Sequence, residues 1–262
     1  MNRLEGEIAV ITGGARGIGL AIAEAFHSEG ACVCIADVRV ELAQRVADKI
    51  GPFAMAVELD VTDEVSWEIA LRTCEERFGA ITVLVNNAGV AEGAPIAETT
   101  LESYRRVTEV NQTGVFLGMK SVIPAMKRAG RGSIINMSSI DGLVGSPRII
   151  SYIASKWAVR GMTKAVAMEM GPFGIRVNSI HPGHVVTELG LPEGVDAEVI
   201  SEMVTEHTER HAPLQRTGLP AEIAAMAVFL ASAESSYCSG SEFVVDGGFT
   251  AGYPAPGSPD PW

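Results

Sequence analysis

Tyr152 and Lys156 are the two residues whose types and spacing most directly suggest chemistry. They lie four positions apart in a run typical of a helix, so both side chains project from one face. A free phenol is a poor base near neutral pH, but a nearby ammonium favours the phenolate, and we expect Lys156 to lower the pKa of Tyr152. Such a pair can exchange a proton with an alcohol oxygen beside a hydride acceptor. The alternative is that Tyr152 packs in the core while Lys156 is solvated.

A glycine-rich turn near the N-terminus is a candidate site for the hydride acceptor. The apolar run 8–11 predicts a buried strand, Gly13, Gly17 and Gly19 follow it, and residues 20–26 are typical of a helix. Missing Cβ atoms let the backbone approach a pyrophosphate, and a helix N-terminus offers N–H groups to it. This strand–turn–helix context favours a dinucleotide site over an ordinary tight turn.

Asp37 ends a second apolar run, 31–36, and lies 18 residues past Gly19. A carboxylate at this position can accept a hydrogen bond from a ribose 2′-OH and repels a 2′-phosphate, so we predict NAD rather than NADP. Arg16 and Arg39 are the opposing residues, since either can reach a phosphate. Asp37 can also serve as a turn or cap before the helix predicted at about 40–50.

Polar residues also follow later predicted strands. Asp60 comes after the run 53–59 and can bond an adenine amino group, and Ser139 comes after the run 132–137, 13 residues before Tyr152. Ser139 can hold a substrate oxygen or bond only its local backbone. Asn111, within the helical stretch 101–126, is a poor helix former and needs a polar partner. The other expected strands are 81–85, 175–180 and 242–246, and the other expected helices are 64–78, 153–170 and 220–231.

Composition bounds the class of protein. The chain has 262 residues, of which 47% are hydrophobic, and this favours one globular α/β domain over residues 1–250. Lys and Arg number 20 against 32 Asp and Glu, which argues against a nucleic-acid partner. The four cysteines form no Cys-x-x-Cys pair, and no metal site is expected. No apolar run approaches membrane-span length, so no membrane association and a cytoplasmic location are expected. We interpret the polar segment 188–212 as a mobile substrate lid and 251–262 as a C-terminal tail.

Together these motifs resemble those of the short-chain dehydrogenase/reductase family. The matching segments occur in the family's order, from about Leu4 to Gly248: Thr12 to Gly19, Asn86 to Gly89, Asn111, Ser139, Tyr152 with Lys156, and Pro182-Gly183 with Thr187. The resemblance implies a Rossmann-type, doubly wound, seven-stranded parallel sheet of order 3-2-1-4-5-6-7 between two helical layers. It also implies a nicotinamide cofactor and, as is usual in the family, a homotetramer.

The resemblance implies a role for each matching residue. Tyr152 would be the general acid/base, and Lys156 would lower its pKa and hold the nicotinamide ribose. Ser139 would orient the substrate oxygen, and Asn111 would bend its helix and position a water. The residues implied for cofactor binding are Gly13, Arg16, Gly17, Ile18, Gly19, Asp37, Asp60, Val61, Asn87, Ala88, Gly89, Tyr152, Lys156, Pro182, Gly183, Val185 and Thr187.

Within the family, the segments 136–143 and 152–161 look most similar to bacterial NAD-dependent 3α(or 20β)-hydroxysteroid dehydrogenases. The expected function is therefore NAD(H)-dependent interconversion of a secondary alcohol and a ketone on a hydrophobic substrate such as a hydroxysteroid. The alternatives are a sugar, a terpenoid alcohol, a 3-oxoacyl thioester, or a non-catalytic dinucleotide sensor. Asp141 would favour a more polar substrate, and His184, His207 and His211 are interpreted as surface residues of the lid region. The expected substrate residues are Ser139, Asp141, Tyr152, His184 and Leu189.

Overall fold

Seven parallel strands form one sheet in the order β3-β2-β1-β4-β5-β6-β7 in the computed structural model, which describes residues 2–187 and 197–252. The strands are β1 (Ile8–Thr12), β2 (Cys32–Asp37), β3 (Ala54–Glu58), β4 (Val83–Asn86), β5 (Gly132–Met137), β6 (Ile175–Pro182) and β7 (Glu242–Val245). The helices are α1 (Gly17–Ser28), α2 (Val40–Ile50), α3 (Glu64–Phe78), α4 (Leu101–Thr108), α5 (Gly114–Ala129), α6 (Ile150–Met170), α7 (Ala197–His211) and α8 (Pro220–Ala231). The predicted doubly wound α/β fold and its strand order are confirmed.

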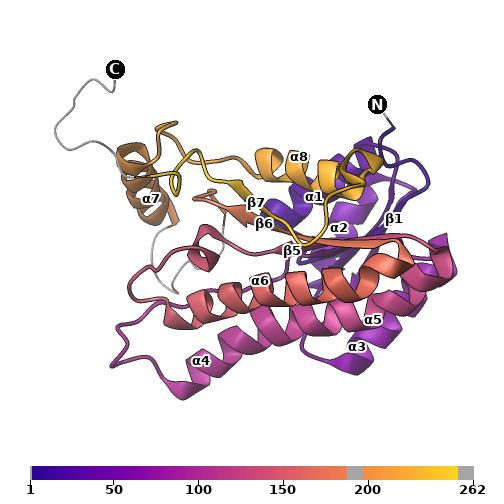
Figure 1. Cartoon of the computed structure of the whole chain (residues 1–262), viewed down its shortest axis with the longest axis horizontal. Coiled ribbons are helices and arrows are strands. Elements are labelled where there is room, and N and C mark those ends of the chain that lie inside the picture. The colour runs from indigo at the N-terminus through magenta and orange to yellow at the C-terminus, as the bar shows by residue number, and fades with distance from the viewer. Residues whose placement is uncertain (1, 188–196, 253–262) are drawn as a thin grey trace.

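Helices cover both faces of the sheet. One apolar cluster joins the sheet to α1, α2 and α8, and the other joins it to α3, α5 and α6 (Figure 1). Side chains alternate along a strand, so on β1 Ala9 and Ile11 lie in the first cluster and Val10 in the second. Burial on both faces explains why the strands were recognisable as continuous apolar runs.

The long helical stretch contains a local change of geometry at Asn111. A π-helical turn, Glu109–Thr113, separates α4 from α5. The buried Asn111 side chain accepts from the Val90 backbone N–H at 2.8 Å and donates to the Val90 carbonyl at 2.8 Å and to Ser155 Oγ at 3.3 Å. The amide therefore has the polar partners that an asparagine inside a helix requires. The predicted stretch is helical, but it is interrupted and ends at Ala129.

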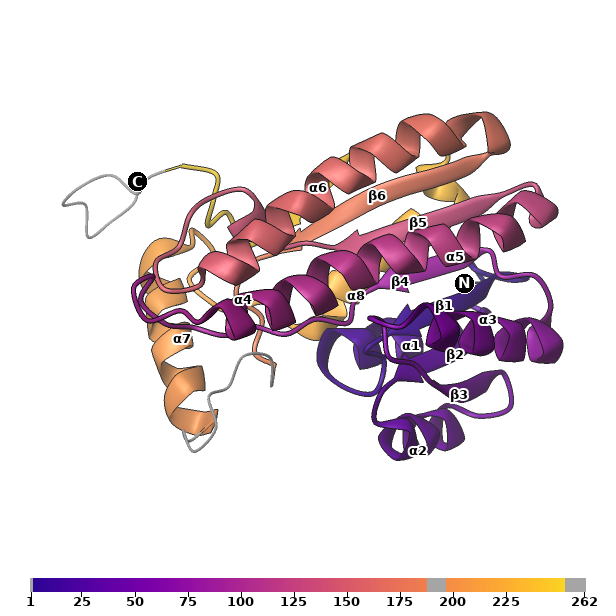
Figure 2. The ribbon, with the colours of Figure 1, turned by 90° about the horizontal axis from the view of Figure 1, so that it is seen from below.

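The segment interpreted as a lid is partly a regular helix. Residues Ala197–His211 form α7, which the polar composition of 188–212 did not indicate. In Figure 2, α7 stands beside the carboxyl end of the sheet, near the start of α6. Residues 188–196 and 253–262 lie outside the described part of the chain, and the mobility of the segment stays a prediction.

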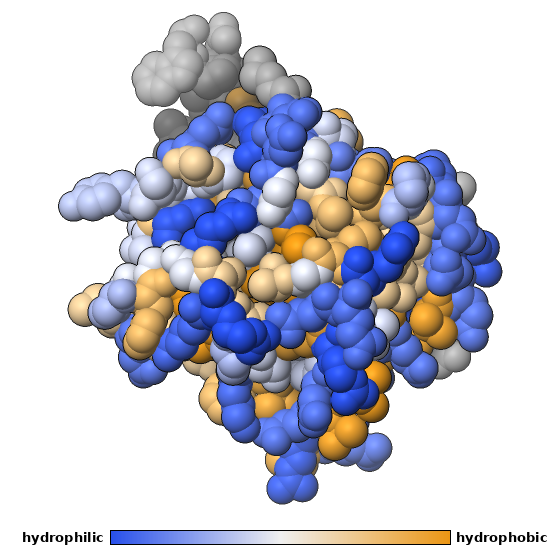
Figure 3. Space-filling view, turned by 90° about the vertical axis from the view of Figure 1, so that its right-hand side faces the viewer, coloured by the Kyte–Doolittle hydropathy of each residue, from blue (hydrophilic) through white to orange (hydrophobic). Residues whose placement is uncertain are grey.

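Figure 3 views the molecule from the opposite end, where the strands begin, and there hydrophilic residues surround small apolar areas. Among the described residues, no helix combines the length and apolarity needed to cross a bilayer.

Candidate active site

The predicted site residues gather where the strands end. Because all strands are parallel, their carboxyl ends meet at one edge of the sheet. The glycine turn follows β1, Asp37 ends β2, Asn87 follows β4, and Ser139 follows β5. The start of α6 adds Tyr152, since this helix begins at Ile150 and not at the predicted residue 153.

The glycine turn depends on the absence of side-chain atoms. Gly13 has a φ of +62°, which L residues rarely adopt, and a Cβ on Gly19 would lie only 2.2 Å from the Gly13 carbonyl oxygen. Asn87 Nδ2 donates to the carbonyls of Thr12 at 3.0 Å and Gly13 at 3.2 Å. The strand end after β4 therefore holds the turn after β1 in place.

A cavity of about 440 Å³ adjoins this turn. The expected cofactor residues that line it are Gly13, Arg16, Gly17, Ile18, Asp37, Asp60, Val61, Asn87, Ala88, Gly89 and Thr187. Arg39, considered from the sequence as a residue that could reach a phosphate, also lines the cavity. Four further lining residues were not predicted: Val38, Leu59, Val90 and Val110. All four are adjacent in the sequence to predicted residues, so extending each motif by one position would have found them.

The cavity fits a nicotinamide dinucleotide. A Cβ on Gly13 would lie 2.9 Å from Ala88 Cα, so the turn and the Asn87–Gly89 segment pack closely beneath the cavity. The helix N-terminus of α1 lies directly after Arg16, and peptide N–H groups there suit a pyrophosphate. Asp37 lines the same cavity at the end of β2.

Other expected cofactor residues lie outside the lining of this cavity. Gly19 lies beneath the turn, against Gly13 and Asn87. The Gly183 N–H donates to the Val245 carbonyl at 3.0 Å, and Val185 packs against the apolar core and pairs with Gly218. Pro182 is the buried last residue of β6. Packing accounts for these residue types: Gly19 has no room for a side chain, a Cβ on Gly183 would lie 2.8 Å from Asp246 Cα, and Val185 makes apolar contacts.

Asp37 is buried and bonded to the backbone on both sides. Its carboxylate accepts from the N–H groups of Ala15 at 3.2 Å and Arg39 at 3.0 Å, and Arg39 Nε lies 3.7 Å from Oδ1. Asp37 therefore forms a turn, while the N-cap position of α2 is Arg39. Asp37 and Arg39, which were expected to favour different cofactors, therefore form an ion pair.

Tyr152 and Lys156 are both buried at the start of α6. The prediction that they share one helix face is confirmed, and the alternative of a solvated Lys156 is wrong, because its exposed fraction is 4%. Lys156 Nζ donates to the Met137 carbonyl at 2.8 Å and lies 5.3 Å from the centre of the Tyr152 ring. The ammonium is thus held between the end of β5 and the phenol.

The expected direction of the Tyr152 pKa is wrong for this structure. Burial raises the pKa of Tyr152 well above its usual range, the Asp141 carboxylate raises it further, and a hydrogen bond with Ser139 lowers it. Burial also lowers the pKa of Lys156 to about 8, although Asp141 opposes this. Desolvation is the largest cause in both cases, because burial disfavours the phenolate and the ammonium alike.

Ser139 and Asp141 form a compact polar turn next to Tyr152. Ser139 Oγ accepts from the Asp141 N–H at 3.1 Å and lies 3.3 Å from Asp141 Oδ2. Ser146 Oγ donates to the other carboxylate oxygen at 2.5 Å. Ser139 therefore makes the local backbone bond considered from the sequence, and its side chain also lowers the pKa of Tyr152.

His184 is half-buried, whereas His207 and His211 are exposed as expected. His184 Nδ1 lies 2.9 Å from Thr208 Oγ1 of α7, and its ring packs edge-on against Phe249, with ring centres 5.0 Å apart. The interpretation of His184 as a surface residue is therefore wrong, since it packs between α7 and the segment after β7. Leu189 lies outside the described residues.

Comparison with known proteins agrees with this geometry. A family model described as "Enoyl-(Acyl carrier protein) reductase" matches residues 13–250. The chain is 46% identical over 250 residues to a 3-alpha-(or 20-beta)-hydroxysteroid dehydrogenase of Mycobacterium tuberculosis, covering 95% of this chain and 92% of the relative. It is 44% identical over 255 residues to an NADP-dependent (R)-specific alcohol dehydrogenase of Lentilactobacillus kefiri, covering 95% of this chain and 99% of the relative.

A solved structure gives the same answer at the level of the fold. A short-chain type dehydrogenase/reductase from Mycobacterium marinum superposes with a TM-score of 0.88 at 36% identity, covering 95% of this chain and 97% of that one. The glycine turn, the buried Tyr152–Lys156 pair and these similarities lead to one conclusion. The chain belongs to the short-chain dehydrogenase/reductase family, whose members are oxidoreductases that use a nicotinamide dinucleotide.

Proposed function

We propose that this protein interconverts a secondary alcohol and a ketone on an apolar cyclic substrate such as a hydroxysteroid, with NAD(H) as the cofactor. The observation that carries the proposal is the burial of Tyr152 and Lys156 on one face of α6, next to the turn that carries Ser139 and at the sheet edge that also bears the glycine turn. The Ser139 and Tyr152 hydroxyls form a pair suited to one substrate oxygen.

Each of these side chains has a defined part. Ser139 orients the substrate oxygen, and Tyr152 gives a proton to it or takes one from it. In the described structure the Tyr152 pKa is raised, so the phenol carries its proton and is ready to donate it to a ketone oxygen. The bound dinucleotide supplies or accepts the hydride. Lys156 holds positive charge near the Tyr152 ring, anchored on the Met137 carbonyl.

The names of several relatives support a cyclic alcohol. Besides the hydroxysteroid dehydrogenase, the chain is 42% identical over 262 residues to a trans-4-hydroxycyclohexanecarboxylate dehydrogenase of Sinomonas cyclohexanicum. It is also 40% identical over 254 residues to a cyclopentanol dehydrogenase of a Comamonas species. These three names denote alcohols with an all-carbon ring, which fits the predicted apolar substrate better than a sugar.

The preference for NAD rests on Asp37. Its carboxylate lines the cavity, so it would accept from a ribose hydroxyl and repel a 2′-phosphate. Arg16 and Arg39 line the same cavity, and one relative is named NADP-dependent, so both cofactors must be compared directly.

A panel of alcohols and ketones, run with both cofactors and followed by NAD(P)H absorbance, tests the proposal. We expect turnover of cyclic secondary alcohols or ketones with NAD(H), and tighter binding of NADH than of NADPH in fluorescence titration. Faster turnover of sugars or of a 3-oxoacyl thioester would contradict the substrate class. A flat response to the whole panel, with NADH bound, would favour the non-catalytic sensor.

We also propose the homotetramer that the family resemblance implies. Exposed apolar side chains on the outer helices support an interface there, since Phe116 of α5 and Trp157 of α6 have exposed fractions of 49% and 47%. A monomeric mass in analytical ultracentrifugation would contradict this proposal.

A further inference from the structure

We propose that His181 is a positioning residue for Ser139, and that Arg160 holds the other end of the same turn. The inference rests on the proposed function, because it concerns the hydroxyl that orients the substrate oxygen. The sequence analysis gave neither residue a role, although Arg160 lies within the segment 152–161, and neither residue lines the dinucleotide cavity.

His181 lies in β6 and is completely buried. Its Nδ1 lies 2.9 Å from the Ser139 carbonyl oxygen, and its Nε2 lies 2.9 Å from Ser179 Oγ. A carbonyl oxygen can only accept, so Nδ1 carries the proton, and in the neutral ring Nε2 accepts from the Ser179 hydroxyl. Burial lowers the pKa of His181, which keeps the imidazole in this neutral form.

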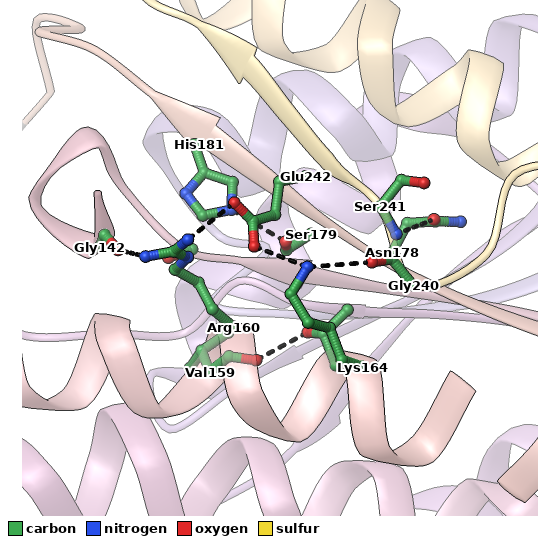
Figure 4. A network of polar contacts seen from close by, with 12 residues as sticks. Gly142, Val159, Arg160, Lys164, Asn178, Ser179, His181, Gly240, Ser241 and Glu242 are labelled. Carbon is green, nitrogen blue, oxygen red and sulfur yellow. Dashed lines mark hydrogen bonds and ion pairs between the residues drawn. The ribbon is translucent and has the colours of Figure 1, made fainter. Parts of the chain in front are cut away.

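Arg160 performs the same task three residues further along the turn. Its Nη1 donates to the Gly142 carbonyl at 2.7 Å, and its Nη2 pairs with Glu242 at 3.0 Å. Lys164 Nζ lies 2.8 Å from the other oxygen of Glu242. Figure 4 shows these side chains between α6 and β7, with Gly142 and His181 on neighbouring sides of the Arg160–Glu242 pair.

The two contacts hold the short turn that carries Ser139 and Asp141. The carbonyls of Ser139 and Gly142 are the ends of this turn, and each accepts from a side chain of another element. The base of the turn is fixed as well, since the Ser138 N–H donates to the Ile180 carbonyl at 2.8 Å and Ser138 Oγ donates to the Lys156 carbonyl at 3.1 Å. The position of the Ser139 hydroxyl relative to Tyr152 is thus set by β6 and α6.

The difference from an ordinary core histidine is that His181 acts on catalysis through Ser139. His181→Leu removes the donor at similar volume, and we expect kcat to fall roughly 10- to 100-fold with NADH affinity nearly unchanged, because small displacements of a reacting group are costly. In His181→Asn the amide nitrogen can take the place of Nδ1, and most of the lost kcat should return. Arg160→Met should give a smaller loss of the same kind.

A double-mutant cycle with Ser139→Ala separates positioning from general stability. If His181 acts through the Ser139 hydroxyl, His181→Leu costs little further kcat once that hydroxyl is gone. Arg176→Met is the matched control: it lies at the other end of β6, and its guanidinium donates to the Leu230 carbonyl at 2.7 Å. This control should lower the melting temperature and leave kcat unchanged.

Losses for His181→Leu and Ser139→Ala that multiply, or a folded His181→Leu with normal kcat, would overturn the inference and leave the proposed function intact. If His181→Leu does not fold, the same cycle with Arg160→Met decides in the same way. Normal turnover of Ser139→Ala itself would overturn both the role of that hydroxyl and the inference built on it.

Discussion

Two turns at the carboxyl edge of the sheet differ in how they are built. The turn after β1 requires residues without side chains. Gly13 has a left-handed backbone conformation, and a side chain on Gly19 would collide with the Gly13 carbonyl oxygen. The turn after β5 works because polar side chains are present, from Ser139 and Asp141 within it to His181 and Arg160 behind it. The first turn is therefore a cradle formed by backbone atoms for the cofactor, and the second turn fixes the position of the Ser139 hydroxyl.

This difference predicts two patterns of sensitivity. A steric cradle fails abruptly, since a backbone atom cannot move away from a new Cβ without moving the turn. A turn held by several hydrogen bonds loses its geometry gradually, since each bond contributes only part of the energy that positions the Ser139 hydroxyl. Substitutions in the first turn should therefore affect cofactor binding, and those around the second turn should affect turnover.

The strongest way to separate the two functions is Tyr152→Phe. It keeps the buried ring and removes the group that carries the proton, so we expect kcat to fall at least about 100-fold, the low end for general acid/base catalysis. NADH affinity, measured by fluorescence titration, should stay unchanged. Tyr104→Phe, on α4, is the control and should behave as the wild type. Turnover of Tyr152→Phe within a few-fold of the wild type would refute the assignment.

Gly19→Ala attacks the other turn. The new Cβ would lie 2.2 Å from the Gly13 carbonyl and 2.6 Å from Asn87 Nδ2. We expect the Kd for NADH to rise at least about tenfold, together with a lower melting temperature, because overpacking costs roughly 1–3 kcal/mol. Gly161→Ala is the control, since it lies within α6 with open space around its Cβ, and alanine there should stabilise the helix slightly. Normal NADH affinity in Gly19→Ala would show that the cradle tolerates a side chain.

Asp37→Asn sharpens the comparison by changing charge without changing shape. The amide oxygen can still accept from the Ala15 N–H, whereas the repulsion of a 2′-phosphate is removed. We expect the ratio of NADPH to NADH affinity to increase about tenfold, equivalent to roughly 1.4 kcal/mol. Asp48→Asn, on the exposed side of α2, should leave this ratio as it is. An unchanged ratio in Asp37→Asn would mean that Arg16 or Arg39 determines the preference.

Asp141→Asn should produce the smallest effect, a shift along the pH axis. The Asp141 carboxylate raises the pKa of both Tyr152 and Lys156, because it favours the ammonium and disfavours the phenolate. Removing this charge lowers both pKa values, so the alkaline limb of the pH–rate profile should move to lower pH. A limb that stays in place, or moves to higher pH, would contradict the influence of Asp141 on the pair.

Sequence reasoning found much of the fold and the candidate site from short stretches of neighbouring residues. The continuous apolar runs marked the strands, and the order of Gly13, Asn87, Ser139 and Tyr152 along the chain indicated the family. The helix α7 was missed because the segment was interpreted from its polar, acidic composition, although Val199, Ile200, Met203 and Val204 recur at helical spacing. The resemblance implied a bend at Asn111, but the π-helical turn Glu109–Thr113 was not predicted, because the partner of Asn111, Val90, lies 21 residues away in the sequence.

By itself the sequence determined where the chain turns, which side chains end the strands, and that a phenol and an ammonium share a helix face. Each of these depends on local geometry: the period of a helix or strand, and the backbone freedom of glycine. Only the tertiary structure decided the directions in which the pKa values of Tyr152 and Lys156 are shifted, and the position of Ser139. These depend on burial and on contacts such as His181 with Ser139, 42 residues apart, and desolvation acts only once the whole sheet and its helices have excluded water.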